Sequence, residues 1–338
     1  MKKGFIKVLA TAICISFIFC SCSLKTVKTG KTQMKLSNKN ANSTTVAVFQ
    51  YICDIYENKI ITGQQESTWM DTPEYEMDYI LNATGFLPAM RGLDFMNDDF
   101  DGVVQRATDW WNKGGLVTIC WHCGPDFSGN YDNCKEDEIE NWDLVLTEGT
   151  PENKAFIENM DKAGKALAEL QEKGVTVLWR PFHEFDGAWF WWGKGGSENF
   201  KKLWIMMYNH FTNDLQLNNL IWVLGYSHNG KDYKGKPAKW YPGDEYCDIV
   251  GADSYEVNEN GAEERLHKIV KKITQGKKPL IFHECGQIPT IEQLKETPWC
   301  SFMTWHTEWL IDTNTKEELQ DIYSSDYTVT LEDLPEFK

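Results

Sequence analysis

A regular alternation of short apolar runs with longer amphipathic stretches occupies most of the sequence from residue 59 onwards. The runs lack polar alternation, which is typical of strands buried on both faces. The predicted strands cover residues 59–65, 86–94, 116–122, 175–184, 219–226, 248–255, 279–286 and 300–306. The predicted helices cover residues 46–58, 73–82, 98–112, 151–173, 197–212, 261–274, 290–297 and 315–323. Eight buried strands that alternate with helices predict an α/β fold, a single (β/α)8 barrel.

Polar and aromatic side chains recur at the carboxyl ends of the predicted strands. Barrel enzymes build their sites on this face from the loops that follow the strands. The residues at these ends are Asp94, His122, Glu184, Asp253, Tyr255, Glu284 and Trp305. We therefore expect a functional site at this end of the barrel.

The fourth predicted strand carries the densest group of such side chains. Arg180, His183 and Glu184 leave the strand together, and Trp189 and Trp192 follow in the next loop. Sugar rings present apolar C–H faces that pack on aromatic rings, while a glycosidic oxygen needs a carboxyl group to protonate it. An ion pair with Arg180 is the alternative interpretation of Glu184, but the other neighbours favour a sugar-cleaving site.

A second carboxylate is predicted across the barrel mouth from the first. Glu184 closes the fourth strand, and Glu284 closes the seventh. Glycoside hydrolysis needs one carboxylic acid that protonates the leaving oxygen and one carboxylate that attacks or activates water. The acid needs a raised pKa, which apolar walls provide, and the nucleophile needs a hydrogen-bond donor such as Tyr255.

These motifs resemble those of a known family. Residues 179–184, Trp-Arg-Pro-Phe-His-Glu, and residues 186–193, Asp-Gly-Ala-Trp-Phe-Trp-Trp-Gly, resemble the acid/base motif of glycoside hydrolase family 26. The best-known members of that family are β-mannanases. Similarity extends from about residue 60 to residue 309. The resemblance implies a retaining double displacement in a clan A barrel, with no cofactor and no metal site.

The resemblance also implies a role for each matching residue. Glu184 would be the acid/base and Glu284 the nucleophile. His183 would hold the acid/base side, and Tyr255 would orient Glu284 through a hydrogen bond. The residues expected to contact the sugar are His122, His183, Trp189, Trp192, Tyr255 and Trp305, and those expected to support the site are Arg180 and Asp253.

Three residues depart from the family pattern. Asp186 stands where asparagine is frequent, Cys285 where phenylalanine is common, and His306 where arginine often sits. We expect the first two to leave the chemistry intact. The third affects the distal glycone subsite and leaves the choice between endo and exo cleavage open.

The N-terminal residues have the pattern of an export signal. Residues 1–21 carry lysines before an apolar run that is too short to span a membrane. Ser21 before Cys22 resembles a bacterial lipoprotein cleavage site, so we expect lipidation of Cys22, with ordinary signal cleavage nearby as the alternative. Residues 22–45 are predicted to be a flexible tether and residues 46–338 the catalytic barrel. The expected location is the bacterial cell envelope, lipid-anchored or secreted, with membrane contact only through the lipid.

Seven cysteines follow the tether at spacings that suggest no disulfide framework. We expect buried or free thiols, and a Cys123–Cys134 disulfide remains an open alternative.

The acidic composition narrows the class of partner. A net charge of −16 argues against nucleic acid, because phosphate binding needs clustered lysine and arginine. The predicted function is a monomeric endo-β-1,4-mannanase that acts on mannan, glucomannan or galactomannan. The alternatives are the same mechanism on mixed-linkage glucan or β-1,3-xylan, exo-acting release of mannobiose, a non-catalytic glycan-binding protein, and a metal-dependent barrel hydrolase.

Overall fold

The apolar runs of the sequence form parallel strands that close on themselves. The computed structural model describes residues 34–227, 237–255 and 263–337. Within them, the barrel strands are β1 Ile60–Gln65, β2 Met90–Asp94, β3 Leu116–Cys120, β4 Val177–Arg180, β5 Leu220–Ser227, β6 Ile249–Ser254, β7 Leu280–Cys285 and β8 Ser301–Thr304. Each strand pairs with the next, and β1 pairs with both β2 and β8. The predicted (β/α)8 barrel is confirmed.

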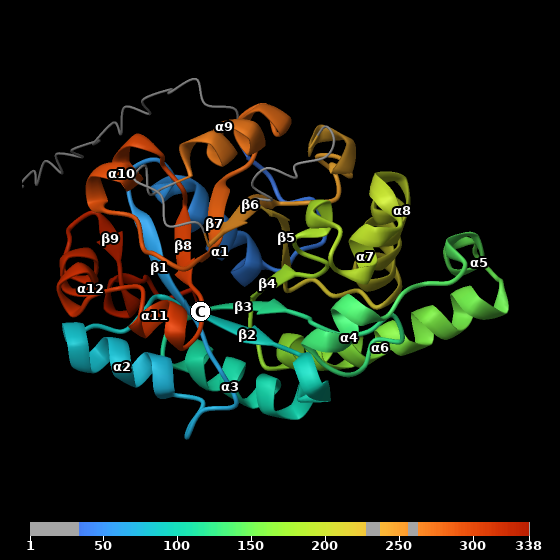
Figure 1. The fold of residues 1–338 in the computed structure, drawn as a ribbon, viewed down its shortest axis with the longest axis horizontal. Coiled ribbons are helices and arrows are strands. Elements are labelled where there is room, and N and C mark those ends of the chain that lie inside the picture. Colours follow the sequence, from blue (N-terminus) through green and yellow to red (C-terminus); the bar gives the residue numbers. More distant parts are fainter. Residues whose placement is uncertain (1–33, 228–236, 256–262, 338) are drawn as a thin grey trace, which may run out of the picture. The chain divides into compact units, whose positions relative to one another are not determined.

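Helices surround the strands on the outside of the barrel (Figure 1). The helices that match predicted ones are α1 Ser43–Ile55, α2 Tyr75–Thr84, α3 Phe100–Asn112, α6 Pro151–Glu172, α8 Gly196–Asn209, α9 Glu264–Ile273, α10 Ile291–Glu296 and α12 Lys316–Tyr323. Four shorter ones were not predicted: α4 Tyr131–Glu136, α5 Trp142–Leu146, α7 Trp191–Lys194 and α11 Glu308–Ile311. The short helices follow barrel strands, so they belong to the loops at the carboxyl ends.

Helix α6 shows how the sequence sets these elements. Thr150 caps it by accepting a hydrogen bond from the Asn153 backbone N–H, and Pro151 occupies the first turn, where no N–H is needed. Its apolar residues recur at helical spacing and are buried, as predicted from the sequence. Helix α6 packs beside α3 and α5.

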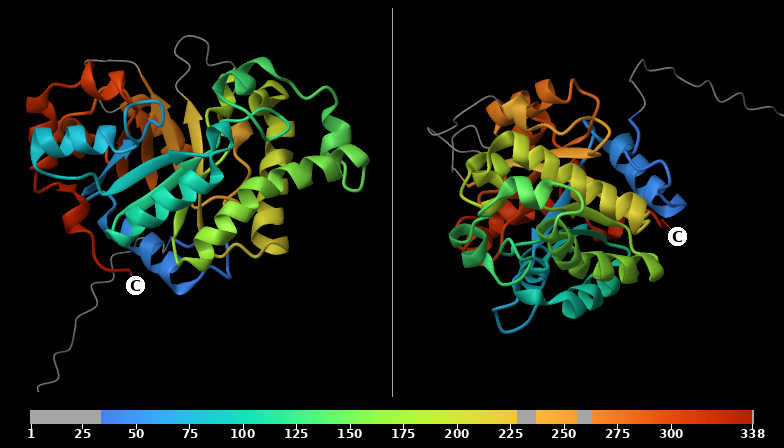
Figure 2. Two further views of the ribbon diagram at one scale, coloured as in Figure 1. Left: turned by 90° about the horizontal axis from the view of Figure 1, so that it is seen from below. Right: turned by 90° about the vertical axis from the view of Figure 1, so that its right-hand side faces the viewer.

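Helix α1 lies at the opposite end of the barrel from the predicted site (Figure 2). The Asn42 backbone N–H donates to the carbonyl of Asn218, which precedes β5, and the hydroxyl groups of Thr45 and Thr176 lie 3.1 Å apart just before β4. Helix α1 therefore covers the amino-terminal ends of β4 and β5, away from the carboxyl ends where the site is predicted.

The folded unit begins earlier than the sequence indicated. The backbone N–H of Ser37 donates to Asp248 at 2.5 Å, and the Asn38 amide donates to the Leu217 carbonyl at 3.3 Å. These residues therefore belong to the barrel unit, although they fall inside the predicted tether, 22–45. The predicted signal segment, 1–21, and Cys22 lie outside the described residues. None of the helices within the described residues has the length and apolarity that crossing a membrane requires.

A short ninth strand extends the sheet beside β1. Strand β9, Thr328–Val329, pairs with β1, and the Thr62 hydroxyl donates to the Val329 carbonyl at 2.8 Å. Two residues are too few to give a periodic signal, so the sequence did not predict it. The seven cysteines of the described residues are free thiols, and this result settles the disulfide alternative for Cys123 and Cys134.

Candidate active site

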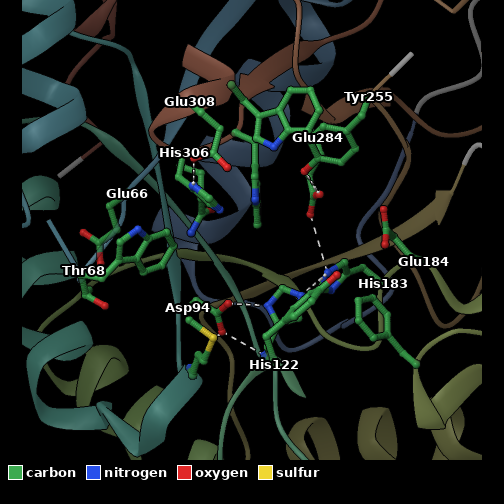
Figure 3. Close-up of a pocket in the computed structure, with 17 residues that line it drawn as sticks. Glu66, Thr68, Asp94, His122, His183, Glu184, Tyr255, Glu284, His306 and Glu308 are labelled. Carbon is green, nitrogen blue, oxygen red and sulfur yellow. Dashed lines mark hydrogen bonds and ion pairs between the residues drawn. The ribbon is translucent and has the colours of Figure 1, made fainter. Parts of the chain in front are cut away.

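The carboxyl ends of the strands enclose a cavity of about 450 Å³. Six of the predicted site residues line it: His122, His183, Glu184, Tyr255, Glu284 and Trp305. Figure 3 shows Glu184 at one side of this cavity and Glu66, Thr68 and His306 at the other. The sequence-based placement of a site on this face is therefore matched by the geometry.

A second cavity of about 320 Å³ adjoins the first. It is lined by Lys135, Trp189 and Ser254, among others, and shares Glu184 and Tyr255 with the larger cavity. Glu284 lines the larger cavity and is not among the residues that line the smaller one. Glu184 thus stands at the border between two spaces, and Glu284 faces one of them.

Glu284 is held by hydrogen-bond donors on both carboxylate oxygens. The Tyr255 hydroxyl donates to Oε2 at 2.5 Å, and the Arg180 guanidinium donates to Oε1 at 2.7 Å. The ring Nε2 of His183 lies 3.7 Å from the same Oε1. Donors of this kind favour the ionised carboxylate, as a nucleophile requires.

Arg180 connects Glu284 to a third carboxylate. It forms a second ion pair with Asp253, and both side chains are fully buried. Burial raises the pKa of Asp253 well above its usual value, while the positive charge of Arg180 opposes this effect. Burial lowers the pKa of Arg180, but the negative charges of Asp253 and Glu284 raise it by more. The net increase in pKa keeps the guanidinium charged. The predicted supporting residues therefore hold Glu284 from the barrel interior.

The strand that carries Glu284 is irregular at this point. The pairing of β7 with β6 shifts register between Ala252 and Asp253, and its pairing with β8 shifts between Phe282 and Cys285. Such irregularities change the direction in which a side chain points and are frequent beside active sites. Here they place Glu284 in the cavity and His283 in the barrel, where its Nε2 lies 2.9 Å from the Thr118 hydroxyl.

Glu184 occupies a different backbone environment, just after β4. Its φ is 55° and that of Phe182 is 50°, in the left-handed region that non-glycine residues rarely adopt. The Glu184 backbone N–H donates to the Gly225 carbonyl at 2.8 Å and ties this turn to β5. Strained backbone held in this way is frequent at functional sites, where it fixes the direction of a side chain.

The carboxyl group of Glu184 favours the protonated state. Burial and the negative charge of Glu284 raise its pKa to about 8, although Arg180 and the Trp189 indole act in the opposite direction. The Trp189 indole N–H donates to Oε2 at 3.0 Å. A carboxyl group with this pKa holds its proton at neutral pH, as a general acid requires.

The two glutamates lie close together. One carboxylate oxygen each from Glu184, Glu284 and Asp253 lies within 4.8 Å of the others, a spacing that would also suit a metal ion. The guanidinium of Arg180 already contacts Asp253 and Glu284, so the protein supplies the positive charge between these carboxylates. The cluster therefore fits a carboxylate pair with an internal counter-ion better than a metal centre.

Asp94, Cys120 and His122 form the other group with ligand spacing in the described residues. Asp94 accepts a hydrogen bond from Nδ1 of His122 at 2.5 Å, and the Cys120 thiol donates to the Leu93 carbonyl at 3.6 Å. Burial raises the pKa of that thiol well above its usual value, so it stays protonated and is a poor metal ligand. We read this group as support for His122.

A chain of hydrogen bonds fixes the two histidines of the cavity. With Nδ1–H of His122 donating to Asp94, the His122 Nε2 accepts from Nε2–H of His183 at 3.1 Å. Burial, with the nearby charge of Arg180, lowers the pKa of His183 well below its usual value and keeps the ring neutral. Asp94 closes β2 and was seen at a strand end in the sequence, but its function in orienting His122 was not predicted.

The tryptophans after β4 do not all face the two cavities. Trp189 lines the smaller cavity, as expected of a sugar-contacting residue. The prediction for Trp192 is wrong, because its side chain is fully buried and its indole N–H donates to the His183 carbonyl at 2.7 Å. Trp192 therefore supports His183 from behind. Trp191 is also fully buried, and its indole donates to the Cys123 carbonyl at 2.8 Å.

Several residues that line the cavities were not predicted from the sequence. Tyr131 of α4 lines both cavities, with its ring centroid 5.4 Å from that of His122 and 5.8 Å from that of Phe190. Trp69 lines the larger cavity, with its ring against that of His306. These residues belong to loops or to short helices, where no periodic pattern marks them.

Two departures from the family pattern have a structural explanation. Asp186 accepts hydrogen bonds at 2.8 Å and 3.0 Å from the backbone N–H and the hydroxyl of Ser227, so its carboxylate holds the end of β5. The Cys285 thiol donates to the Met303 carbonyl at 3.3 Å inside the barrel. Neither residue lines the described cavities.

Known proteins are similar to this chain in sequence and in fold. A mannan endo-1,4-β-mannosidase of Thermothelomyces thermophilus is 30% identical over 88% of this chain and 63% of its own length. The crystal structure of a ruminal family 26 endo-β-1,4-mannanase matches with a TM-score of 0.81 and 31% identity, over 90% of this chain and 71% of that one.

A third similar protein is the β-mannanase from a symbiotic protist of the termite Reticulitermes speratus, solved in complex with a gluco-manno-oligosaccharide. It matches with a TM-score of 0.81 and 29% identity, over 90% of this chain and 98% of that one. The chain spans between about half and two thirds of the length of four of the curated relatives that it matches. The family model for glycosyl hydrolase family 26 matches residues 37–333, so the chain belongs to glycosyl hydrolase family 26.

Proposed function

We propose that the chain is a retaining endo-β-1,4-mannanase that hydrolyses mannan, glucomannan or galactomannan. The observation that carries the mechanism is the pair of glutamates, which lie in unlike environments with one carboxylate oxygen of each within 4.8 Å of the other. Retaining glycosidases hold their carboxyl groups about 5–5.5 Å apart, whereas inverting ones need about 6.5–9.5 Å to admit a water molecule. The separation supports retention of configuration.

In the first step, the ionised Oε of Glu284 attacks the anomeric carbon while the bond to the leaving oxygen breaks. Glu184, protonated at neutral pH, gives its proton to that oxygen, so that the leaving sugar departs as a neutral alcohol. The product is a sugar esterified to Glu284. Tyr255 and Arg180 stabilise the carboxylate before attack and orient it toward the larger cavity.

In the second step, Glu184, now ionised, takes a proton from a water molecule that attacks the same carbon. The ester bond to Glu284 breaks, and its electron pair returns to the carboxylate. Two inversions give net retention. Glu184 suits both steps because it borders both cavities and therefore meets the leaving sugar and the incoming water.

The substrate class rests on the relatives. The proteins named above are described as mannan endo-1,4-β-mannosidases or β-mannanases, and one of them was solved with a gluco-manno-oligosaccharide. The aromatic and histidine walls of the larger cavity, Trp305, His122 and His306 among them, suit a neutral sugar. Mixed-linkage glucan and β-1,3-xylan remain rival polymers for the same carboxylate pair.

The test is sugar release from a panel of glucomannan, galactomannan, unsubstituted mannan, mixed-linkage glucan and β-1,3-xylan. We expect early mixtures of short manno-oligosaccharides from the three mannans. Disaccharide alone from the outset would replace endo by exo cleavage, and turnover of a different polymer would replace the substrate. A protein that releases no sugar from any of the five polysaccharides but retains glycan on a column would be a binding protein.

We also propose that the chain is exported and lipid-anchored through Cys22, at the bacterial cell envelope, as a monomer. The apolar segment before Ser21 and Cys22 supports the anchor. Cys22→Ala is expected to abolish incorporation of labelled fatty acid and to move the protein from the membrane to the soluble fraction. Unchanged fractionation would overturn the anchor. Sedimentation equilibrium tests the monomer.

A further inference from the structure

The two cavities can be assigned to the two sides of the cleaved bond. The sugar that becomes attached to Glu284 must lie where Glu284 is exposed, which is the larger cavity. The leaving sugar must lie beyond Glu184, toward Trp189, in the smaller one. The larger cavity therefore holds the glycone, and its end farthest from Glu184 is the end marked by Glu66, Thr68 and His306 in Figure 3.

An aromatic pair closes that glycone end. The rings of Trp69 and His306 meet edge to face, with centroids 4.5 Å apart and planes at 88°. Trp69 is 53% exposed, the most exposed of the large apolar side chains in the described residues. A tryptophan that leaves so much apolar surface in water beside a cavity is suited to cover the face of a sugar ring.

The two rings come from distant parts of the chain. Trp69 lies in the loop between β1 and α2, and His306 lies between β8 and α11. Their mutual placement therefore depends on whatever joins these two loops.

The carboxylate of Glu76 joins them. Glu76 is fully buried in the first turn of α2. Its oxygens accept from the Ser67 backbone N–H at 3.1 Å, from the Ser67 hydroxyl at 2.7 Å and from the Thr307 backbone N–H at 3.0 Å. Ser67 stands two residues before Trp69, and Thr307 directly follows His306.

The bond to Thr307 also stabilises an unfavourable backbone. Thr307 has φ 38° and ψ −108°, outside the regions that a β-branched residue adopts readily. Its hydroxyl donates to Glu308 at 2.7 Å and accepts from Nδ1–H of His306 at 2.6 Å. This arrangement leaves Nε2 of a neutral His306 as an acceptor for a sugar hydroxyl.

We propose that Glu76 is a positioning residue, which holds Trp69 and His306 together as the outer glycone-binding wall and so sets how many glycone sugars the enzyme binds productively. The inference rests on the proposed mannanase function. Glu76 lines neither cavity and acts only through Trp69 and His306, so its effect falls on binding of the longer substrates. We expect a change in KM for oligosaccharides that reach the wall and none for shorter ones.

The experiment measures kcat and KM for manno-oligosaccharides of increasing length. In Glu76→Gln the amide group has one acceptor oxygen, so its NH2 faces the backbone N–H of either Ser67 or Thr307, and that N–H loses its partner. We expect KM for the longer substrates to rise about three- to tenfold with kcat within about twofold of wild type. Trp69→Ala, at an exposed side chain, should raise the same KM values selectively.

Matched variants distinguish an effect on the position of Trp69 and His306 from the loss of a negative charge and from a failure to fold. Asp78→Asn removes an acidic charge from the same turn of α2 at an exposed position and should match wild type at every substrate length. Ser67→Ala removes one donor without adding bulk, and it replaces Glu76→Gln if thermal unfolding shows that the latter is not folded. A shift in KM at all lengths, or none in the folded variants, would overturn the inference alone. If the wild-type protein hydrolyses none of the manno-oligosaccharides, the proposed function is overturned and this inference with it.

Discussion

Two glutamates of this site have the same side chain and opposite surroundings. Glu284 receives hydrogen bonds from a guanidinium and a phenol, on a strand inside the barrel wall. Glu184 receives one from an indole, on a left-handed turn, and its pKa is raised to about 8 by burial and by the charge of Glu284. In the proposed mechanism these surroundings assign the roles, because the negative charge on Glu284 helps to keep the proton on Glu184.

The largest effect is expected when Glu284 is removed. Glu284→Ala leaves no atom to form the covalent intermediate, so kcat on mannan should fall by about 10⁴-fold or more. Added azide should enter the vacated space and attack an activated aryl glycoside directly. A single inversion gives the α-glycosyl azide, which NMR identifies. A β-azide from this variant would reverse the assignment of the two glutamates.

Removal of Glu184 should give a smaller loss that depends on the leaving group. Glu184→Ala should lower kcat on mannan by about 10²- to 10⁴-fold, because the leaving oxygen is no longer protonated. Aryl glycosides with acidic phenols need no such help and should still form the intermediate in a rapid burst. Azide should then give the β-azide, after two inversions. Equal losses on mannan and on activated aryl substrates would contradict an acid/base role.

Tyr255→Phe tests the hydrogen bond that separates the two environments. The variant removes one donor from Glu284 and keeps the ring, whose centroid lies 4.7 Å from that of Trp309. A hydrogen bond to a charged group contributes about 1.5–3 kcal/mol, so kcat/KM should fall by roughly 10- to 100-fold. Thermal unfolding should change little. Unaltered kinetics would show that Arg180 alone holds the nucleophile.

The smallest expected effect is a shift in the pH dependence of kcat/KM. The first step needs protonated Glu184, so kcat/KM should fall as pH rises through about 8. The Trp189 indole favours the ionised form of Glu184, so Trp189→Phe should move this alkaline limb upward, by at most about one pH unit. The measurement is kcat/KM against pH on a soluble oligosaccharide. A downward shift would contradict the sign of this interaction.

Much of the barrel was readable from the sequence because buried strands and amphipathic helices have distinct periods. The strand-end rule then located Glu184 and Glu284 without knowledge of any distance. Helix α6 was predicted almost to its ends, because Thr150 and Pro151 mark its start.

The features that the sequence did not reveal depend on the direction in which a side chain points and on contacts between residues far apart in the chain. Trp189 and Trp192 stand in one loop, but α7 begins at Trp191 and turns the latter ring inward. Glu76 looks like an ordinary acid in the first turn of a helix, and only the fold brings Thr307 to it. Ser37 likewise reads as part of a polar tether until its bond to Asp248 is seen.

The border position of Glu184 and Tyr255 has a kinetic consequence. In the proposed mechanism the glycone remains attached to Glu284 in the larger cavity after the first step, while the leaving sugar departs from the smaller one. Whatever enters next, water or the hydroxyl of another sugar, meets the same base at Glu184. In that mechanism Trp189 and Lys135, which line the smaller cavity, would influence the partition between hydrolysis and sugar transfer, because they would bind an acceptor sugar in competition with water.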